Sequence, residues 1–214
     1  MKFFNKYEYK IPKIWFHKIK GIEHVATSKE LEISKGLTTN HSKKFLETRA
    51  LVRQSLSTIF DLDPLAIPIN ANPGEPPELI NGMGHVSFSH CNDAIAIVWH
   101  SEKIGVDIER LDRNFDYKKL AKKYFKNDIK LKFDKKFILE RWCAIEAAIK
   151  WDHGKLSNDL KHWKYFDENK ELIHKKKNLH LKLTQIKFYN WNITIVSKNH
   201  LTDQKEIICT SSQF

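Results

Sequence analysis

Long apolar runs, paired cysteines and low-complexity stretches are all missing from this sequence of 214 residues. No apolar run approaches the twenty or so residues that a membrane-spanning helix needs, and the opening residues mix charges into their apolar positions, unlike a secretory signal. The three cysteines are far apart and form no C-x-x-C pair, which argues against a disulfide framework and against a zinc site. We therefore expect a soluble, cytoplasmic protein that makes no membrane contact.

Acidic residues are the minority charge, with 26 Asp and Glu against 37 Lys and Arg, so the formal net charge is +11. Such an excess attracts an anionic partner. Nucleic acid, an anionic membrane, a phosphorylated cofactor and an acidic protein surface would all satisfy it, and a solvated lysine-rich surface is the simplest explanation for most of the lysines. With 41% hydrophobic residues the chain can also bury a core, which argues against disorder.

Residue spacing predicts a mixture of helices and strands. Thr27 and Glu30 are spaced as a capping box ahead of a short helix, and a loop rich in Pro, Gly and Asn is expected at 61–84. Residues 94–99 are apolar on both faces, as in a buried strand, and 104–111 alternate, so the two runs on either side of HSEK predict a hairpin. Further helices are predicted at 43–60, 116–125 and 137–151, and further strands at 85–90 and within 178–198.

The strand predicted at 104–111 places two carboxylates on one face. Asp107 and Glu109 alternate with Val106 and Ile108, so the acidic pair lies opposite the apolar pair. Residues at i and i+2 of a strand are about 6.5 Å apart, which lets both side chains reach one cation. For an isolated D-x-E motif, however, a solvated strand face is the simpler explanation.

A helix supplies the residues that make a site at this strand plausible. Trp142, Glu146 and Lys150 follow one another at four-residue steps and share one helical face. An ordinary ion pair would explain Glu146 and Lys150 alone, but Glu146 stands among alanines and isoleucines, where an ionised carboxylate needs compensation. A cation shared with Asp107 and Glu109 would provide it. Oxygen ligands favour Mg²⁺ or Mn²⁺, and the lysine beside them suggests phosphoryl-type transfer.

Ser89 and His90 are the third candidate. As neighbours on a strand they point to opposite faces, so they cannot form a nucleophile and its base. Each can donate a hydrogen bond to a phosphate, and Arg49 and Arg53 could add charge to the same anion. A structural histidine at a strand end is the simpler explanation of His90 when it is taken alone.

Taken in order, VSFSHCND, IGVDIER and RWCAIEAAIK resemble the motifs of the Sfp-type 4′-phosphopantetheinyl transferases, over roughly residues 43 to 157. The resemblance implies transfer of the phosphopantetheine arm of coenzyme A to a serine of an apo carrier protein, with release of 3′,5′-adenosine bisphosphate. It also implies an α+β fold of two similar halves related by a pseudo-twofold axis, which we place at 1–100 and 101–214, with the metal site in the second half.

The resemblance also implies roles for individual residues. Asp107, Glu109 and Glu146 would hold Mg²⁺, Glu146 would deprotonate the serine directly or through a water, and Lys150 would balance charge at the phosphate. Contacts to coenzyme A would come from Lys44, Arg49, Arg53, Ser89, His90 and Lys150. Because such carriers are typically acidic, we expect the lysines of 116–125 to dock the carrier, although a solvated surface explains them almost as well: Lys118, Lys119, Lys122 and Lys123.

Two departures from the family pattern affect the nucleotide end and the end of the second helix. Gly74-Glu75-Pro76 replaces a glycine, a basic residue and a proline, and 153–156 retains one glycine of a G-x-G-L motif.

Two other functions would also explain the positive charge of the chain. A metal-dependent nuclease usually spaces its carboxylate and lysine two apart on a strand, whereas Glu146 and Lys150 are four apart. A nucleic-acid-binding protein would need a recognition motif, and we find none, so we expect no nucleic-acid partner.

Overall fold

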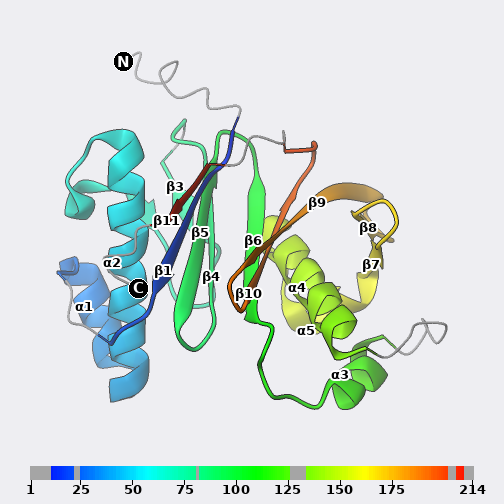
Figure 1. Ribbon diagram of the computed structural model, residues 1–214. Helices are drawn as coiled ribbons and strands as arrows, with labels where there is room; N and C mark the ends of the chain where they lie inside the picture. The colour runs from blue at the N-terminus through cyan, green and yellow to red at the C-terminus, as the bar shows by residue number, and fades with distance from the viewer. Residues whose placement is uncertain (1–10, 22–24, 81, 126–133, 202–205, 210–214) are drawn as a thin grey trace. The chain divides into compact units, whose positions relative to one another are not determined.

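The computed structural model describes residues 11–21, 25–80, 82–125, 134–201 and 206–209. The chain forms two compact units, one of residues 1–101 with 205–214 and one of residues 102–204. Each unit combines helices with a sheet of mainly antiparallel strands, so the fold class is α+β (Figure 1). These units differ from the predicted halves, 1–100 and 101–214, because 205–214 belongs to the first unit.

The first unit is built on a four-stranded sheet of order β11-β1-β5-β4. Its strands are β1 (Lys13–Lys18), β4 (His85–His90), β5 (Ala94–His100) and β11 (Glu206–Cys209), and β11 pairs with β1 in parallel. The long helix α2 (Thr39–Phe60) packs on this sheet, and α1 (Ser28–Lys35) lies beside α2 (Figure 1). The core between α2 and the sheet contains Val52 and Leu56 from the helix with Trp15, Ile97 and Trp99 from the strands.

The second unit is built on a five-stranded antiparallel sheet of order β6-β10-β9-β8-β7. These strands are β6 (Ile104–Arg110), β7 (Trp163–Phe166), β8 (Glu171–His174), β9 (Leu179–Phe188) and β10 (Trp191–Ser197). Helix α4 (Lys135–Trp151) packs against β6 and β10, with α3 (Tyr117–Tyr124), α5 (Leu156–Asp159) and a 3-10 turn, η2 (Leu160–His162), around it. The apolar side of α4 contributes Ala144, Ala147 and Ala148 to the core of this unit.

Most predicted elements are confirmed. The capping box of Thr27 and Glu30 is present ahead of α1, and the helices predicted at 43–60, 116–125 and 137–151 are α2, α3 and α4. The expected loop at 61–84 also contains a 3-10 turn, η1 (Pro64–Ala66), and a two-stranded ribbon of β2 (Ile69–Asn70) and β3 (Glu78–Leu79).

The predicted hairpin of 94–99 and 104–111 is wrong. In the structure β5 pairs with β1 on one edge and β4 on the other, while β6 pairs with β10 in the other sheet. A strand has only two edges, so β5 has none left for β6. The HSEK segment therefore contains the boundary between the two units, and the hairpin partner of β5 is β4.

Gly105 lets α4 approach β6 closely. A Cβ atom built on Gly105 would lie 2.3 Å from the carbonyl oxygen of Ala147 and 2.8 Å from the amide nitrogen of Trp151. Both are backbone atoms of the helix and cannot rotate away as a flexible side chain could. The glycine of the IGVDIER motif is therefore required for packing, and its face of β6, which also carries Asp107 and Glu109, is the face that α4 covers.

We predict that Gly105→Ala lowers the free energy of unfolding by about 3 kcal/mol, because the added methyl group forces helix and strand apart. Urea denaturation followed by circular dichroism would measure the loss. Gly36→Ala is the control, since its Cβ would lie 3.6 Å from its nearest neighbour, the carbonyl oxygen of Ile33. Equal stability of Gly105→Ala and the wild-type protein would show that α4 does not approach β6 this closely.

Candidate active site

Asp107, Glu109, Glu146 and Lys150 come together between β6 and α4, all within the second unit. Asp107 is buried, and its Oδ1 accepts a hydrogen bond of 2.7 Å from Lys150 Nζ. Burial opposes the charge of Lys150, but the negative charges of Asp107 and Glu146 outweigh it, so the pKa of Lys150 is raised. The helix–strand arrangement expected from the sequence is thus present, with the lysine bonded across to the strand.

Glu109 is bonded to an arginine in the chain that leaves β6. Arg113 Nη1 donates to Glu109 Oε1 over 2.5 Å, and the side chains are 46% and 12% exposed, respectively. Burial raises the pKa of Glu109, while the hydrogen bond from Arg113 opposes that rise. Each strand carboxylate therefore has its own cationic neighbour, Lys150 for Asp107 and Arg113 for Glu109.

Glu146 is in a different position from the two strand carboxylates. It is half-buried on α4, and among the described residues its carboxyl group has no hydrogen bond or ion pair. Burial, followed by the negative charge of Asp107, raises the pKa of Glu146 to about 8, with Lys150 opposing the rise. In the absence of a cation this carboxyl group is therefore protonated at neutral pH.

Two polar side chains of β10 belong to the same region and were not predicted. Thr194 lies opposite Asp107 and Asn192 opposite Glu109 in the ladder, so both are on the face that α4 covers. The Asn192 amide nitrogen donates to Thr194 Oγ1 over 3.1 Å, and both residues are fully buried. The alternating polar residues of WNITIVS were a signal for them, but the sequence does not show that β10 is the neighbour of β6.

Cys143 completes the polar region from the helix side. Its Sγ is 3.8 Å from the carbonyl oxygen of Asn192, and burial, followed by the charge of Asp107, raises the pKa of the thiol. The thiol therefore stays protonated at neutral pH in the metal-free protein, where Cys143 is a small buried side chain.

The donor chemistry of the site fits a hard divalent cation. Its three carboxylates are of the type that Mg²⁺ and Mn²⁺ prefer, and burial, followed by the negative charge of Asp107, raises the pKa of Glu146, so a cation would stabilise the ionised group. Within the described part of the chain, no three Asp, Glu, His or Cys side chains are already grouped to hold a metal. Asp107, Glu109 and Glu146 are the carboxylates that would hold one, and at present Glu109 is bonded to Arg113.

Ser89 and His90 lie at the end of β4 in the first unit. Ser89 is buried and His90 is exposed, which places the two side chains on opposite faces as the strand alternation predicts. Ser89 lies opposite Ala96 and His90 opposite Ile95 in the ladder with β5. The exposed imidazole of His90 is thus accessible to an anion, while the Ser89 side chain faces the protein interior.

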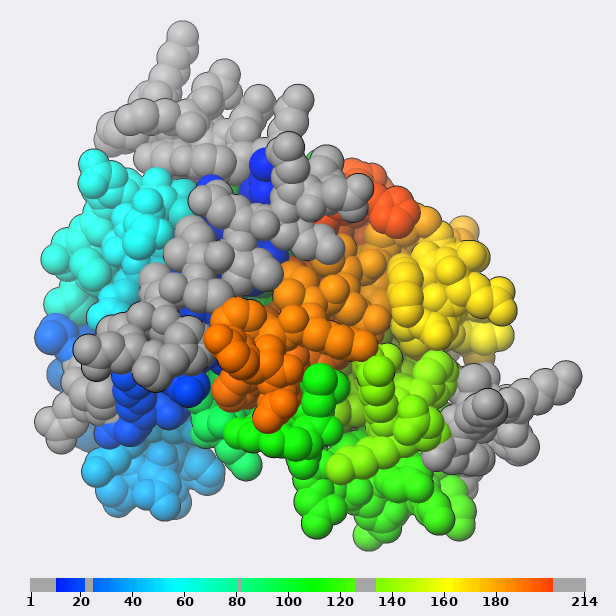
Figure 2. All heavy atoms as spheres, viewed as in Figure 1, coloured from blue at the N-terminus to red at the C-terminus, as the bar shows by residue number. Residues whose placement is uncertain are grey.

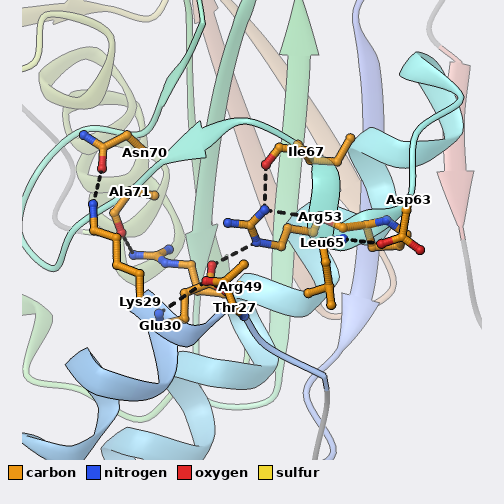
Figure 3. Close-up of polar contacts among 11 residues, drawn as sticks. Thr27, Lys29, Glu30, Arg49, Arg53, Asp63, Leu65, Ile67, Asn70 and Ala71 are labelled. Atoms are coloured by element: carbon orange, nitrogen blue, oxygen red, sulfur yellow. Dashed lines mark hydrogen bonds and ion pairs between the residues drawn. The ribbon is translucent and has the colours of Figure 1, made fainter.

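Arg53 is buried in a network of protein contacts (Figure 3). Its Nε donates to Glu30 Oε1 over 3.0 Å and its Nη1 to the carbonyl oxygen of Ile67 over 2.6 Å. Because Glu30 also closes the capping box with Thr27, the ion pair ties α1 to α2, and the hydrogen bond to Ile67 ties the end of η1 to the same arginine. The network gives Arg53 a structural role, and its contact with coenzyme A remains a prediction.

Arg49 and Lys44 are also engaged with the protein. Arg49 Nη2 donates to the carbonyl oxygen of Ala71 over 2.5 Å (Figure 3). Its guanidinium carbon lies 4.8 Å from the centre of the Phe45 ring and 5.0 Å from that of the Phe88 ring. Burial lowers the pKa of Arg49 to about 10. Lys44 Nζ donates to the carbonyl oxygen of Cys91 over 2.9 Å, next to His90 in sequence. Of the three cations, Lys44 is therefore the one bonded to the chain that follows His90.

A depression of about 360 Å³ lies over α2 beside Arg53. The lining runs from the exposed side chain of Val25 to the buried side chain of Ala50. The depression is lined by Val25, Ala50, Arg53, Gln54, Asp63, Pro64 and Leu65.

The two departures from the family pattern, at Glu75 and at 153–156, lie in a turn and at the end of α4. Glu75 is exposed in a turn, where its carboxylate accepts a hydrogen bond of 2.7 Å from Asn72. After α4, His153 adopts φ 56°, the left-handed conformation in which glycine is usual, and the Gly154 amide donates to the Ile149 carbonyl oxygen over 2.9 Å. The helix thus ends in a left-handed turn built without glycine at its left-handed position.

Neither a scan against protein-family models nor a search of curated proteins finds a match for this chain. Within the described ranges, every helix is too short or too polar to cross a membrane. Fold and site together define an α+β protein of two units, with a partly buried cluster of three carboxylates and a lysine in the second.

The raised pKa of Glu146 predicts a pH-dependent stability. In the unfolded chain Glu146 loses its proton near its ordinary pKa of 4.5, whereas in the folded protein it holds the proton up to about pH 8. The folded state therefore binds more protons between these values, and its free energy of unfolding should fall as pH rises from about 4.5 to about 8. Urea denaturation across this range would measure the slope.

Glu146→Gln keeps the shape of the protonated side chain and should lose most of that slope, so that the variant becomes the more stable protein near pH 8. Glu75→Gln, in an exposed turn, should keep the wild-type slope. Parallel stability curves for Glu146→Gln and the wild-type protein would contradict the assignment of a protonated Glu146.

Proposed function

We propose that this protein is a Mg²⁺-dependent 4′-phosphopantetheinyl transferase, which moves the phosphopantetheine arm of coenzyme A to a serine of an apo carrier protein. The observation that carries the proposal is the bond between Lys150 of α4 and Asp107 of β6, with Glu109 and Glu146 beside it. It joins the two segments that resemble the family motifs into one site. Mn²⁺ could replace Mg²⁺, because the ligands are carboxylates.

The proposed reaction is a displacement at phosphorus. The serine oxygen of the carrier forms a bond to the phosphorus of the phosphopantetheine arm, the bond from that phosphorus to the bridging oxygen breaks, and 3′,5′-adenosine bisphosphate leaves with the electron pair. Glu146, directly or through a water, takes the serine proton. A bound Mg²⁺ would neutralise the charge of the diphosphate.

The residues of the site are suited to these roles. Metal binding would lower the pKa of Glu146 from about 8 and leave the carboxylate ready to accept a proton. Lys150 adds a fixed positive charge for the phosphate that is attacked, and its bond to Asp107 orients it. His90 is the exposed candidate for the nucleotide phosphates. Glu146, Lys150 and the strand carboxylates therefore have separate tasks.

We predict that the protein, incubated with coenzyme A, Mg²⁺ and a panel of apo carrier proteins, adds the arm to at least one carrier. Intact-mass analysis of the carrier would detect the addition. Asp107→Asn and Glu146→Gln should each lower the rate by about 10²–10⁴, the usual contribution of a metal ligand or a positioned base.

Asp112→Asn is the matched control for these variants, because Asp112 is a nearby carboxylate that pairs with Arg110. It should retain wild-type activity. If the wild-type protein modifies no carrier, or if Asp107→Asn keeps the full rate, the proposed activity is wrong. Cleavage of nucleic acid by the same preparation would instead favour the nuclease alternative.

The proposed docking surface for the carrier is the basic face of α3. Its lysines are exposed, and three of them have no carboxylate partner among the described residues: Lys118, Lys119 and Lys122. The fourth, Lys123, lies over the ring of Tyr124. By contrast, Lys170, Lys177 and Lys182 of the same unit are each paired with an acidic side chain. The charge of α3 is therefore available to an acidic carrier.

We predict that charge reversal of Lys118 and Lys122 to Glu raises the KM for the carrier about tenfold and leaves the KM for coenzyme A unchanged, because rim charges act mainly on association. Steady-state kinetics with each substrate varied in turn would separate the two constants. Lys175→Glu with Lys176→Glu, in the turn between β8 and β9, makes the same change of charge on the same unit. An equal effect from that control would remove any special role for α3.

A further inference from the structure

The ion pair between Glu109 and Arg113 has a consequence for metal binding. We propose that Arg113 is a resident counter-ion, which a divalent cation must displace from Glu109 and which therefore lowers the affinity of the site for metal. This inference rests on the proposed metal site and assigns a role to an arginine outside the sequence motifs. It concerns a competition between two cations for one carboxylate.

The geometry makes the competition direct. Arg113 Nη1 donates to Glu109 Oε1 over 2.5 Å, so the guanidinium lies where a cation bound to that oxygen would lie. Glu109 is only 12% exposed, which limits how much water can screen the two positive charges from each other. A divalent ion and the guanidinium cannot share this oxygen without strong repulsion.

Arg113 is able to leave, and Lys150 is less so. The side chain of Arg113 is 46% exposed and belongs to the chain between β6 and α3, so it can turn into solvent without disturbing a helix or strand. Its guanidinium carbon lies 5.2 Å from the centre of the Phe115 ring, which provides a contact on the outer side. Lys150, by contrast, is held on α4 and bonded to buried Asp107.

The surroundings supply a matched comparison. Arg110, three residues earlier, makes a two-bonded ion pair with Asp112, and its guanidinium lies 5.4 Å from the centre of the Trp191 ring. Figure 2 shows the green chain that leaves β6 directly beside the orange tip of the β9–β10 hairpin, to which Leu111 is bonded through Asn190. Two arginines thus occupy the same stretch of chain: Arg113 pairs with the candidate ligand Glu109, whereas Arg110 pairs with Asp112.

Arg113 has opposite effects on the stability of the metal-free protein and on its affinity for metal. Without metal, the guanidinium compensates a largely buried carboxylate that would otherwise repel Asp107, and so stabilises the fold. With metal, the same charge is a competitor. Substitution of Arg113 should therefore lower the stability of the metal-free protein and, at the same time, raise the affinity for metal. A purely structural residue would not produce both effects.

A titration with Mn²⁺ alone tests the inference and needs no enzymatic activity. Electron paramagnetic resonance measures the free Mn²⁺ at each step. We expect Arg113→Gln to bind Mn²⁺ at least about fivefold more tightly than the wild-type protein, the effect of removing one ion pair of roughly 1 kcal/mol. Thermal unfolding without metal should show a lower Tm for the same variant. Arg110→Gln removes an equal charge and should change the Kd by less than about twofold, since it leaves Glu109 paired.

Arg113→Lys keeps the charge but loses the planar fork, and we expect its affinity to fall between the wild-type protein and Arg113→Gln. It replaces Arg113→Gln if that variant fails to fold. Suppose that the wild-type protein binds Mn²⁺ and that the Arg113 variants bind it equally or more weakly. That result would overturn the inference and leave the proposed function intact. Absence of Mn²⁺ binding in the wild-type protein and every variant would overturn the metal site, the proposed function and this inference together.

Discussion

The close contact between α4 and β6 is the constraint on which the candidate site depends. Because Gly105 has no side chain, the helix backbone approaches the strand within a distance that any Cβ would prevent. The carboxylates of Asp107 and Glu109, on the same face, are then covered by a helix and removed from bulk water. Their pairing with Lys150 and Arg113, and the protonation of Glu146, are consequences of that burial.

Arginine has a comparable role in the first unit, but there it joins segments of the protein to one another. Arg53 connects the capping box of α1 with η1, and Arg49 holds the chain at Ala71. Both guanidiniums are buried and their bonds go mainly to backbone carbonyl groups, which fix the path of the loop after α2. The basic edge of α2, which on sequence grounds suggested an anion site, thus stabilises an irregular segment that has little regular structure of its own.

Local patterns predicted the helices, the capping box and the alternation of β6, because these depend on residues close in sequence. The grouping of Asp107, Glu109, Glu146 and Lys150 also followed, since strand and helix each present one face. Strand partners could not be predicted, because pairing depends on which edges are already occupied. For that reason the supposed β5–β6 hairpin was wrong, Asn192 and Thr194 were missed, and Arg113 gave no signal in a segment without periodicity.

The parallel pairing of β11 with β1 affects the order in which the chain can fold during synthesis. The second unit is continuous, from residue 102 to residue 204, so all of its strands are available once that stretch has left the ribosome. The first unit is discontinuous, and its sheet lacks an edge strand until Glu206–Cys209 have been made. The edge of β1 therefore stays exposed while the whole second unit is synthesised, and β11 covers it only afterwards.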